Sequence, residues 1–282
     1  MSLMGIFDFF KRSDNASDRI GKKPGEVTSK EVQKWASKAG DKRSQNFDRQ
    51  EAINALADLC KPLEDEDELE KSPEGRDKIE KRNEIRAEAV TALLKRFTFT
   101  MDPSITDAEE KKTAFDGILS AGKYAMEPVR RFVAKAESIA WPRQIIKELL
   151  DDEAYVGELL AWLSKWDTEY AKFIDPKIQL LVELEELKDP RILEAVSPFL
   201  MDVNEVPRFH AVGAALHQDT SDALTPLLSM FIDEESVRIR TRVCEAFASR
   251  GWVVPEDQRA EARKSLPSGY TIDGDGLFRK KS

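Results

Sequence analysis

The sequence predicts an all-α protein made of stacked helix pairs, and three observations support this. From residue 28 to about residue 250, apolar side chains recur at the three- and four-residue spacing of helices, without the alternation typical of strands. Short connections such as Lys188-Asp189-Pro190 make neighbouring helices run antiparallel. A five-residue string also recurs along the chain, which indicates repeated units of two helices each.

Residues 1–27 are predicted to form a flexible arm, because they are rich in Lys, Ser, Asp and Gly and have no helical periodicity. Near its start, Phe7, Phe9 and Phe10 precede two basic residues. This aromatic knob is a candidate for docking on a partner groove or a membrane surface, and the alternative is that it packs on the protein itself. No secretory signal is recognised in the arm, so a cytoplasmic location is expected.

Residues 28–119 are interpreted as N-terminal helices and degenerate repeats. Thr28 and Glu31 form a capping box that predicts the start of the first helix, and a second helix is expected from about Phe47 to Cys60. In residues 62–78 charge crowds out apolar side chains, so no face can be buried. This stretch is expected to be an acidic loop, or else the frayed start of the next helix.

Residues 120–252 contain the clearest repeats. Further helices are expected at roughly 123–136, 142–151, 153–166, 176–187, 190–201, 205–217, 221–232 and 235–250. The recurring string is Ala, apolar, any residue, Pro, apolar, and its last two copies are 28 residues apart. The three copies span residues 125–129, 195–199 and 223–227, and the last two are followed by turns that contain Asp202 and Asp233.

This pattern resembles the HEAT repeat of the armadillo-type α-solenoids. Pro128, Pro198 and Pro226 match the proline of the first helix, Asp202 and Asp233 match the turn acid, and Val237-Arg238 matches the start of the second helix. The chain departs from the pattern at Val206-Pro207-Arg208, where a proline intervenes, and the unit around Trp162 lacks the helix proline. Over its whole length the chain resembles a bacterial branch of this family. The resemblance implies a right-handed α-α superhelix and does not imply any particular activity.

Residues 253–282 depart from the repeat and are expected to form a cap or tail. Leu266-Pro267-Ser268-Gly269 ends the helices, and the following residues alternate around Gly274-Asp275-Gly276 as in a small hairpin. Because the end of a stacked array exposes an apolar face, we expect this hairpin-like cap to cover the last repeat.

Composition excludes several classes of protein. With 34% charged and 41% hydrophobic residues, the chain is too apolar to be fully disordered and has no run long enough to span a membrane. Two histidines cannot form a three-histidine metal site, and the two cysteines lie in apolar helical patterns. No phosphate-binding loop, His-Glu-x-x-His or Gly-x-Ser-x-Gly motif is present. We therefore expect no catalytic, cofactor-binding or metal-binding residues, and a protein that is not an enzyme.

Charge is distributed unevenly, and this suggests a function. Residues 1–50 carry 11 basic and 7 acidic side chains, whereas residues 151–200 carry 5 and 12. An acidic array with an extended concave surface predicts a non-catalytic scaffold that binds a protein partner, with a basic segment favoured by the charge. The candidate partner-binding residues are Trp162, Trp166, Tyr170, Arg208, Arg238 and Arg242, although packing between repeats is the favoured explanation of the aromatic ones.

Two other functions are known among HEAT-like proteins and stay open as alternatives. The first is nucleic-acid binding of the DNA-glycosylase type, for which Arg238, Arg240 and Arg242 would form a basic ridge. The acidic middle of the chain disfavours it, because affinity for nucleic acid depends on neutralising phosphates. The second is a bilin-lyase-like activity. Oligomeric state is not predicted from the sequence.

Overall fold

The structure is a computed structural model that describes residues 27–281, and within them it is largely helical. Phe7, Phe9 and Phe10, with nearly all of the predicted arm, lie outside the described residues. The chain divides into two compact units. Unit 1 extends to Ala136 and includes Ala140–Leu150, and unit 2 comprises Glu137–Ile139 and the chain from Asp151 onward. This division lies C-terminal to the boundary between residues 119 and 120 that the repeat pattern suggested.

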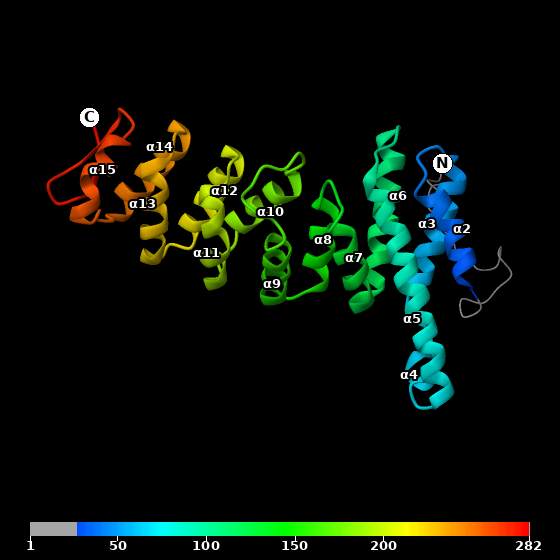
Figure 1. Cartoon of the computed structure of the whole chain (residues 1–282). Coiled ribbons are helices and arrows are strands. Elements are labelled where there is room, and N and C mark those ends of the chain that lie inside the picture. The colour runs from blue at the N-terminus through cyan, green and yellow to red at the C-terminus, as the bar shows by residue number, and fades with distance from the viewer. Residues whose placement is uncertain (1–26, 282) are drawn as a thin grey trace, which may run out of the picture. The chain divides into compact units, whose positions relative to one another are not determined.

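Unit 1 is a bundle in which α3 packs against α2, α5 and α6 (Figure 1). Its core is aliphatic, with Ile53, Leu56 and Leu93 fully buried. Short 3-10 turns precede α7 and follow α5. The helices are α2 (Ser29–Ala39), α3 (Asn46–Cys60), α4 (Glu66–Leu69), α5 (Pro73–Leu94), α6 (Ser104–Ser120), α7 (Met126–Val133) and α8 (Ala140–Leu149), with 3-10 turns η3 (Lys95–Thr98) and η4 (Gly122–Ala125).

The capping box at the start of α2 is confirmed, since the backbone N–H of Thr28 donates to the Glu31 carboxylate at 2.9 Å. Residues 62–78, expected to be an acidic loop or the start of the next helix, contain both: turns flank the short helix α4, which was not predicted, and α5 begins at Pro73. A local cap begins α5, where the Ser72 hydroxyl accepts from the N–H of Gly75 at 3.0 Å and Pro73 occupies the first turn.

Two arginines of α5 connect this charged segment to α3. Arg82 Nη2 donates to the carbonyl of Asp58, and Arg86 Nη2 donates to the carbonyl of Lys61, each at 3.3 Å. Both carbonyls lie at the C-terminal end of α3, where positive charge is favourable. The Arg86 guanidinium also pairs with Glu66 of α4 at 3.2 Å. Helix formation in this charged segment therefore depends on ion pairs and caps rather than on an apolar stripe.

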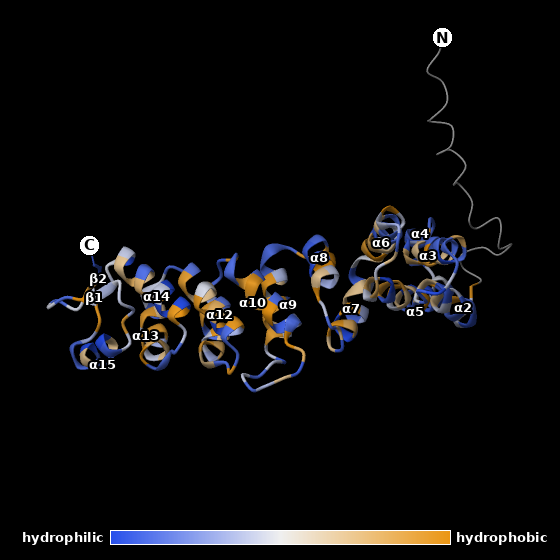
Figure 2. Cartoon of the chain, turned by 90° about the horizontal axis from the view of Figure 1, so that it is seen from above, coloured by the Kyte–Doolittle hydropathy of each residue, from blue (hydrophilic) through white to orange (hydrophobic). Residues whose placement is uncertain are grey.

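Unit 2 contains two layers of helices (Figure 1). One layer contains α10, α12 and α14, in which α12 packs against both of the others, and the second contains α9, α11, α13 and α15. Figure 2 shows apolar and polar residues on each of these helices, as expected when one side of a helix is buried. The helices are α9 (Asp152–Leu163), α10 (Asp175–Glu185), α11 (Pro190–Val196), α12 (Glu205–His217), α13 (Leu224–Asp233), α14 (Val237–Arg250) and α15 (Arg259–Lys264).

The prolines of the recurring strings share one structural position. Pro128 and Pro226 stand in the first turns of α7 and α13, directly after the 3-10 turns η4 and η6 (Ser221–Ala223). Pro198 stands in the first turn of η5 (Ser197–Met201), which continues α11. A first-turn residue has no intrahelical partner for its N–H, so a proline is tolerated where the helix changes type.

The hairpin predicted at the C-terminus is present in unit 2. Strands β1 (Tyr270–Ile272) and β2 (Phe278–Lys280) pair antiparallel. Phe278 is buried, and its ring meets the ring of Phe231 edge-on at 5.6 Å and that of Phe247 at 5.1 Å. The hairpin thus covers apolar surface of α13 and α14, the last long helices of the unit.

The two thiols are expected to be unreactive in the folded protein. Cys60 of unit 1 and Cys244 of unit 2 are both buried, and burial raises the pKa of each thiol to about 12. Because the thiolate is the nucleophile, a disulfide reagent such as Ellman's should label neither cysteine at pH 8 in buffer and both in concentrated urea. Absorbance during the reaction measures this, and rapid labelling of either thiol without urea would contradict the burial described here.

Candidate functional site

A series of polar contacts joins the beginnings of α10 and α12 to the turn before the next helix of the same layer, and the beginning of α14 to the residue after α15. Lys177 of α10 donates to Asp202 at 2.6 Å, and both side chains are fully buried. Arg208 of α12 pairs in the same way with Glu234, at 2.8 Å. Arg240 of α14 donates to the carbonyl of Ser265 at 3.2 Å. Arg208, a predicted partner-binding residue, is therefore directed into the protein.

Acid is expected to weaken this series through Glu234. Burial raises the pKa of its carboxyl, but hydrogen bonds from Arg208 and from the Ser236 N–H outweigh burial, so the net pKa lies below its ordinary value of 4.5. A lowered pKa adds stability above the ordinary value, and this stability is lost as the pH falls through the folded-state pKa. Urea midpoints measured from pH 7 to pH 3 should fall less steeply for Glu234→Gln than for the wild type. If the urea midpoint fell equally steeply with pH in both proteins, the Glu234 carboxylate would not be the group through which acid acts.

Two of the predicted residues, Arg238 and Arg242, meet on the face formed by α10, α12 and α14. Their guanidinium carbons lie 4.0 and 4.4 Å from the centroid of the Phe209 ring. Arg238 also pairs with Glu205 at 2.7 Å, and Arg242 pairs with Glu185. Each arginine is held by both an aromatic ring and a carboxylate, which fixes its position on the helix surface.

The pair of Glu185 and Arg242 links α10 to α14 across α12, and Gly213 makes this crossing possible. A Cβ atom at position 213 would lie 2.5 Å from Arg242 Nη2 and even closer to the Glu185 carboxylate. The second oxygen of Glu185 is 2.8 Å from Nδ1 of His210. Sequence analysis missed Glu185, Phe209 and Gly213. A glycine within an otherwise regular helical pattern was the available signal, since it often marks a close approach of another group.

The same three helices enclose a shallow groove of about 490 Å³, which we call the α12 groove. Small and apolar residues form part of its lining, and charged side chains form the rest. Its basic residues are already paired, Arg242 with Glu185 and Arg250 with Asp219 at 3.0 Å. The lining residues are Glu185, Glu186, Gly213, Leu216, His217, Arg242, Glu245, Ala246, Ser249 and Arg250.

The three aromatic candidates do not come together as a cage. Trp162 is buried, and its indole N–H donates to Glu158 at 2.7 Å. Trp166 is half-buried, with Lys177 Nζ 6.0 Å from its ring centroid. Tyr170 is 79% exposed. Trp162 is therefore a packing residue, whereas Tyr170 presents its ring to solvent.

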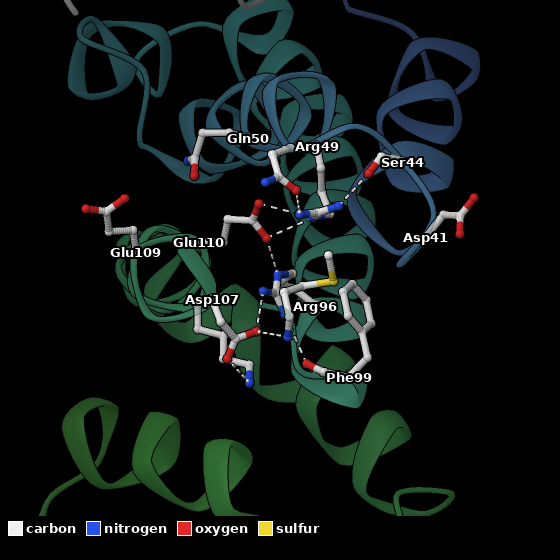
Figure 3. A network of polar contacts seen from close by, with 12 residues as sticks. Asp41, Ser44, Arg49, Gln50, Arg96, Phe99, Asp107, Glu109 and Glu110 are labelled. Carbon is white, nitrogen blue, oxygen red and sulfur yellow. Dashed lines mark hydrogen bonds and ion pairs between the residues drawn. The ribbon is translucent and has the colours of Figure 1, made fainter. Parts of the chain in front are cut away.

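A second polar cluster lies in unit 1 and is inaccessible. Figure 3 shows the Glu110 carboxylate between the guanidinium groups of Arg49 and Arg96, and its contacts to their Nε atoms are 2.9 and 2.6 Å. All three side chains are fully buried. Arg96 also pairs with Asp107 at 2.6 Å. Because no solvent reaches Glu110, this network holds α3, η3 and α6 together rather than binding a ligand.

Within residues 27–281 no group of His, Cys, Asp and Glu side chains is arranged to hold a metal ion. In the same span no helix has both the length and the apolar character needed to cross a membrane. Comparison with protein-family models, with curated proteins and with solved structures found no match.

Gly213→Ala should disrupt the crossing while leaving unit 2 folded. The added methyl displaces the Glu185 and Arg242 side chains, whose flexible ends can move, and alanine gains up to about 1 kcal/mol of helix propensity over glycine. The lost ion pair is partly solvated and contributes at most about 1 kcal/mol. We expect a net change within about 1 kcal/mol in urea unfolding. A much larger loss would show that the α12 backbone cannot accommodate a Cβ atom.

Proposed function

We propose that the chain is a non-catalytic, HEAT-type helical-repeat scaffold that binds a protein partner in the α12 groove. In this proposal the two layers of unit 2 belong to a right-handed α-α superhelix, and α10, α12 and α14 line its inner, concave face. The proposal is supported by two hydrogen bonds of the same kind, each from a side chain at the end of one helix of this layer to a carbonyl at the end of the preceding helix of the layer. Gln218 Nε2 donates to the Leu187 carbonyl 31 residues earlier, and Arg250 Nη2 donates to the Leu216 carbonyl 34 residues earlier, each at 2.9 Å.

The observation that carries the proposed binding function is the crossing of Glu185 and Arg242 over Gly213. It ties three successive helices together and fixes the side chains around the groove before any partner arrives. A site that is already ordered loses less conformational entropy on binding. Such a rigid, solvent-facing groove suits an extended protein segment. With Arg242 and Arg250 paired, the carboxylates of Glu186 and Glu245 favour a segment that carries positive charge.

The nucleic-acid alternative is less well supported by the same contacts. Phosphate binding requires arginines and lysines that can exchange solvent counterions for a phosphate. Arg208, Arg238 and Arg242 are each paired with a carboxylate of a neighbouring element. Neutralising a phosphate with them would break these pairs. No contact described above favours a bilin-lyase-like activity.

Site-specific photo-crosslinking tests the proposed function with two matched serines. A photo-crosslinking amino acid at Ser249, which lines the α12 groove, is compared with one at Ser229, which is exposed on α13 outside the groove. In native cells we expect the Ser249 position to capture one protein repeatedly, with the crosslinked peptide of that protein enriched in Lys and Arg, and the Ser229 position not to capture it.

The result should also respond to the groove itself. Adding Gly213→Ala to the Ser249 probe should reduce capture of that protein several-fold, because the crossing of Glu185 and Arg242 is displaced. Capture of nucleic acid in place of protein, or equal capture from Ser249 and Ser229, would overturn the proposal. Capture that is insensitive to Gly213→Ala would remove the groove as the binding site.

A further inference from the structure

A second surface of unit 2 exposes large apolar side chains at the connections that lead into α10, α12 and α14. Their side chains are between 40% and 79% exposed. Two belong to the connection before α10, one is the last residue of η5, one lies in the turn before α12, and one each belongs to the first turns of α12 and α14. We call this surface the turn edge, and its residues are Tyr170, Phe173, Met201, Val203, Val206 and Val237.

Hydrogen bonds hold the three connections side by side. The Val203 N–H donates to the carbonyl of Thr168 at 3.0 Å, which joins the turn before α12 to the connection before α10. The Ser236 hydroxyl donates to Glu205 at 2.9 Å, which joins the beginning of α14 to that of α12. The apolar residues therefore follow one another along a single edge of the unit rather than being scattered over it.

The folding of unit 2 does not explain these side chains. Single exposed apolar residues are common on protein surfaces, but a contiguous group of them marks an interaction site in soluble proteins. Tyr170 adds a large ring with a polar tip, the residue type enriched at the centres of protein interfaces. The turn edge thus has the composition of a surface that is covered by another polypeptide.

Charge on the turn edge indicates what kind of polypeptide would cover it. The acids Asp202 and Glu234 are buried and already paired, so they are not available to a partner. Other acids of the same connections are exposed, and they outnumber the exposed bases Lys165, Lys172 and Arg238, of which Arg238 is paired with Glu205. These exposed acids are Asp167, Glu169, Asp175, Asp233 and Glu235.

We propose that the turn edge binds a basic amphipathic protein segment, whose apolar side chains cover the exposed residues while its lysines and arginines face the five acids. This second contact surface goes beyond the proposed function and does not depend on the α12 groove. Apolar contact would supply most of the affinity, and the charges would select basic over acidic segments and speed association.

A synthetic peptide tests this directly. The probe is a fluorescent 18-residue amphipathic helix of Leu and Lys, titrated with the full chain and followed by fluorescence anisotropy. The edge variant combines Tyr170→Ser, Val203→Ser and Val237→Ser, and should bind the probe at least tenfold more weakly. The control variant combines Phe47→Ser and Ile105→Ser, which remove exposed apolar area from unit 1, and should bind like the wild type. Circular dichroism confirms that both variants are folded.

Three results would overturn the proposal. One is equal affinity of the wild type and the edge variant for the Leu-Lys probe, or no binding by the wild type. Another is equal binding of a matched Leu-Glu peptide, since the five acids should reject it. The third is a wild-type dimer in sedimentation velocity that the edge variant dissociates, which would assign the surface to a second copy of the chain. The crosslinking experiment at Ser249 is independent of these measurements. A negative result at the turn edge would therefore not contradict the proposed binding in the α12 groove.

Discussion

Replacing Glu110 by Gln is expected to destabilise unit 1 by about 3–5 kcal/mol, because breaking a buried ion network leaves uncompensated charge in the interior. The Glu110 carboxylate accepts from Arg49 and from Arg96, and all three side chains are fully buried. Glutamine keeps the shape of glutamate, but its amide nitrogen presents donors to the two guanidinium groups. The contacts of α6 with α3 and with η3 would therefore weaken, although glutamine has nearly the same volume.

Asp116→Asn provides the matched control, since Asp116 lies on the same helix and pairs with Lys112 on the surface, where both side chains are more than half exposed. Its loss should change stability by no more than about 0.5 kcal/mol. Hydrogen exchange measured by mass spectrometry in increasing urea resolves the two units and assigns the effect to unit 1. Similar losses for both variants would mean that burial does not set the strength of the Glu110 network.

Phe278→Ala should destabilise unit 2 by about 3–5 kcal/mol, the usual loss when a buried phenylalanine is truncated. Its ring is almost completely buried and packs against the rings of Phe231 and Phe247. The truncation removes the ring contact between the hairpin and Phe247 of α14. We expect α13 and α14 to lose protection from hydrogen exchange first, because their apolar surface is then covered least.

Phe173→Ala is the control for this variant. Its side chain is 58% exposed in the same unit, so its truncation should change stability by no more than about 0.5 kcal/mol. Urea unfolding followed by hydrogen exchange gives both values. If Phe278→Ala were as mild as Phe173→Ala, the hairpin would be a loosely attached tail and the last helices would be stable without it.

Local signals were sufficient for much of the fold. Three local signals each predicted where an element begins: the Thr28–Glu31 capping box, the short connection ending at Pro190, and the alternating residues after Gly269. The structure has a helix at the first two places and the hairpin at the third. For the acidic stretch of residues 62–78, local signals left a loop and a helix start both open and did not predict α4. Its helices are held by Arg82 and Arg86 against the end of α3, about 25 residues earlier in the chain, and no local pattern encodes that contact.

The candidate site also combines features that a local sequence pattern predicts with contacts that it cannot predict. Arg238 and Arg242 could be singled out as basic residues of one predicted helix, yet what they contact is decided by helices far away in sequence. Arg242 reaches Glu185 of α10, 57 residues earlier, only because Gly213 lacks a side chain. The sequence pattern shows that a glycine is present at position 213, but it does not show that the side chains of Glu185 and Arg242 meet above it.

The sequence by itself determined the helical class, the order of the helices from α9 to α14 and the hairpin near the C-terminus, because periodicity, caps and turns act over a few residues. The tertiary structure alone decided which charges are buried, which arginines are already paired and which apolar residues remain exposed. Those properties depend on how helices stack, so Trp162 became a packing residue while Tyr170, eight residues later, faces solvent on the turn edge.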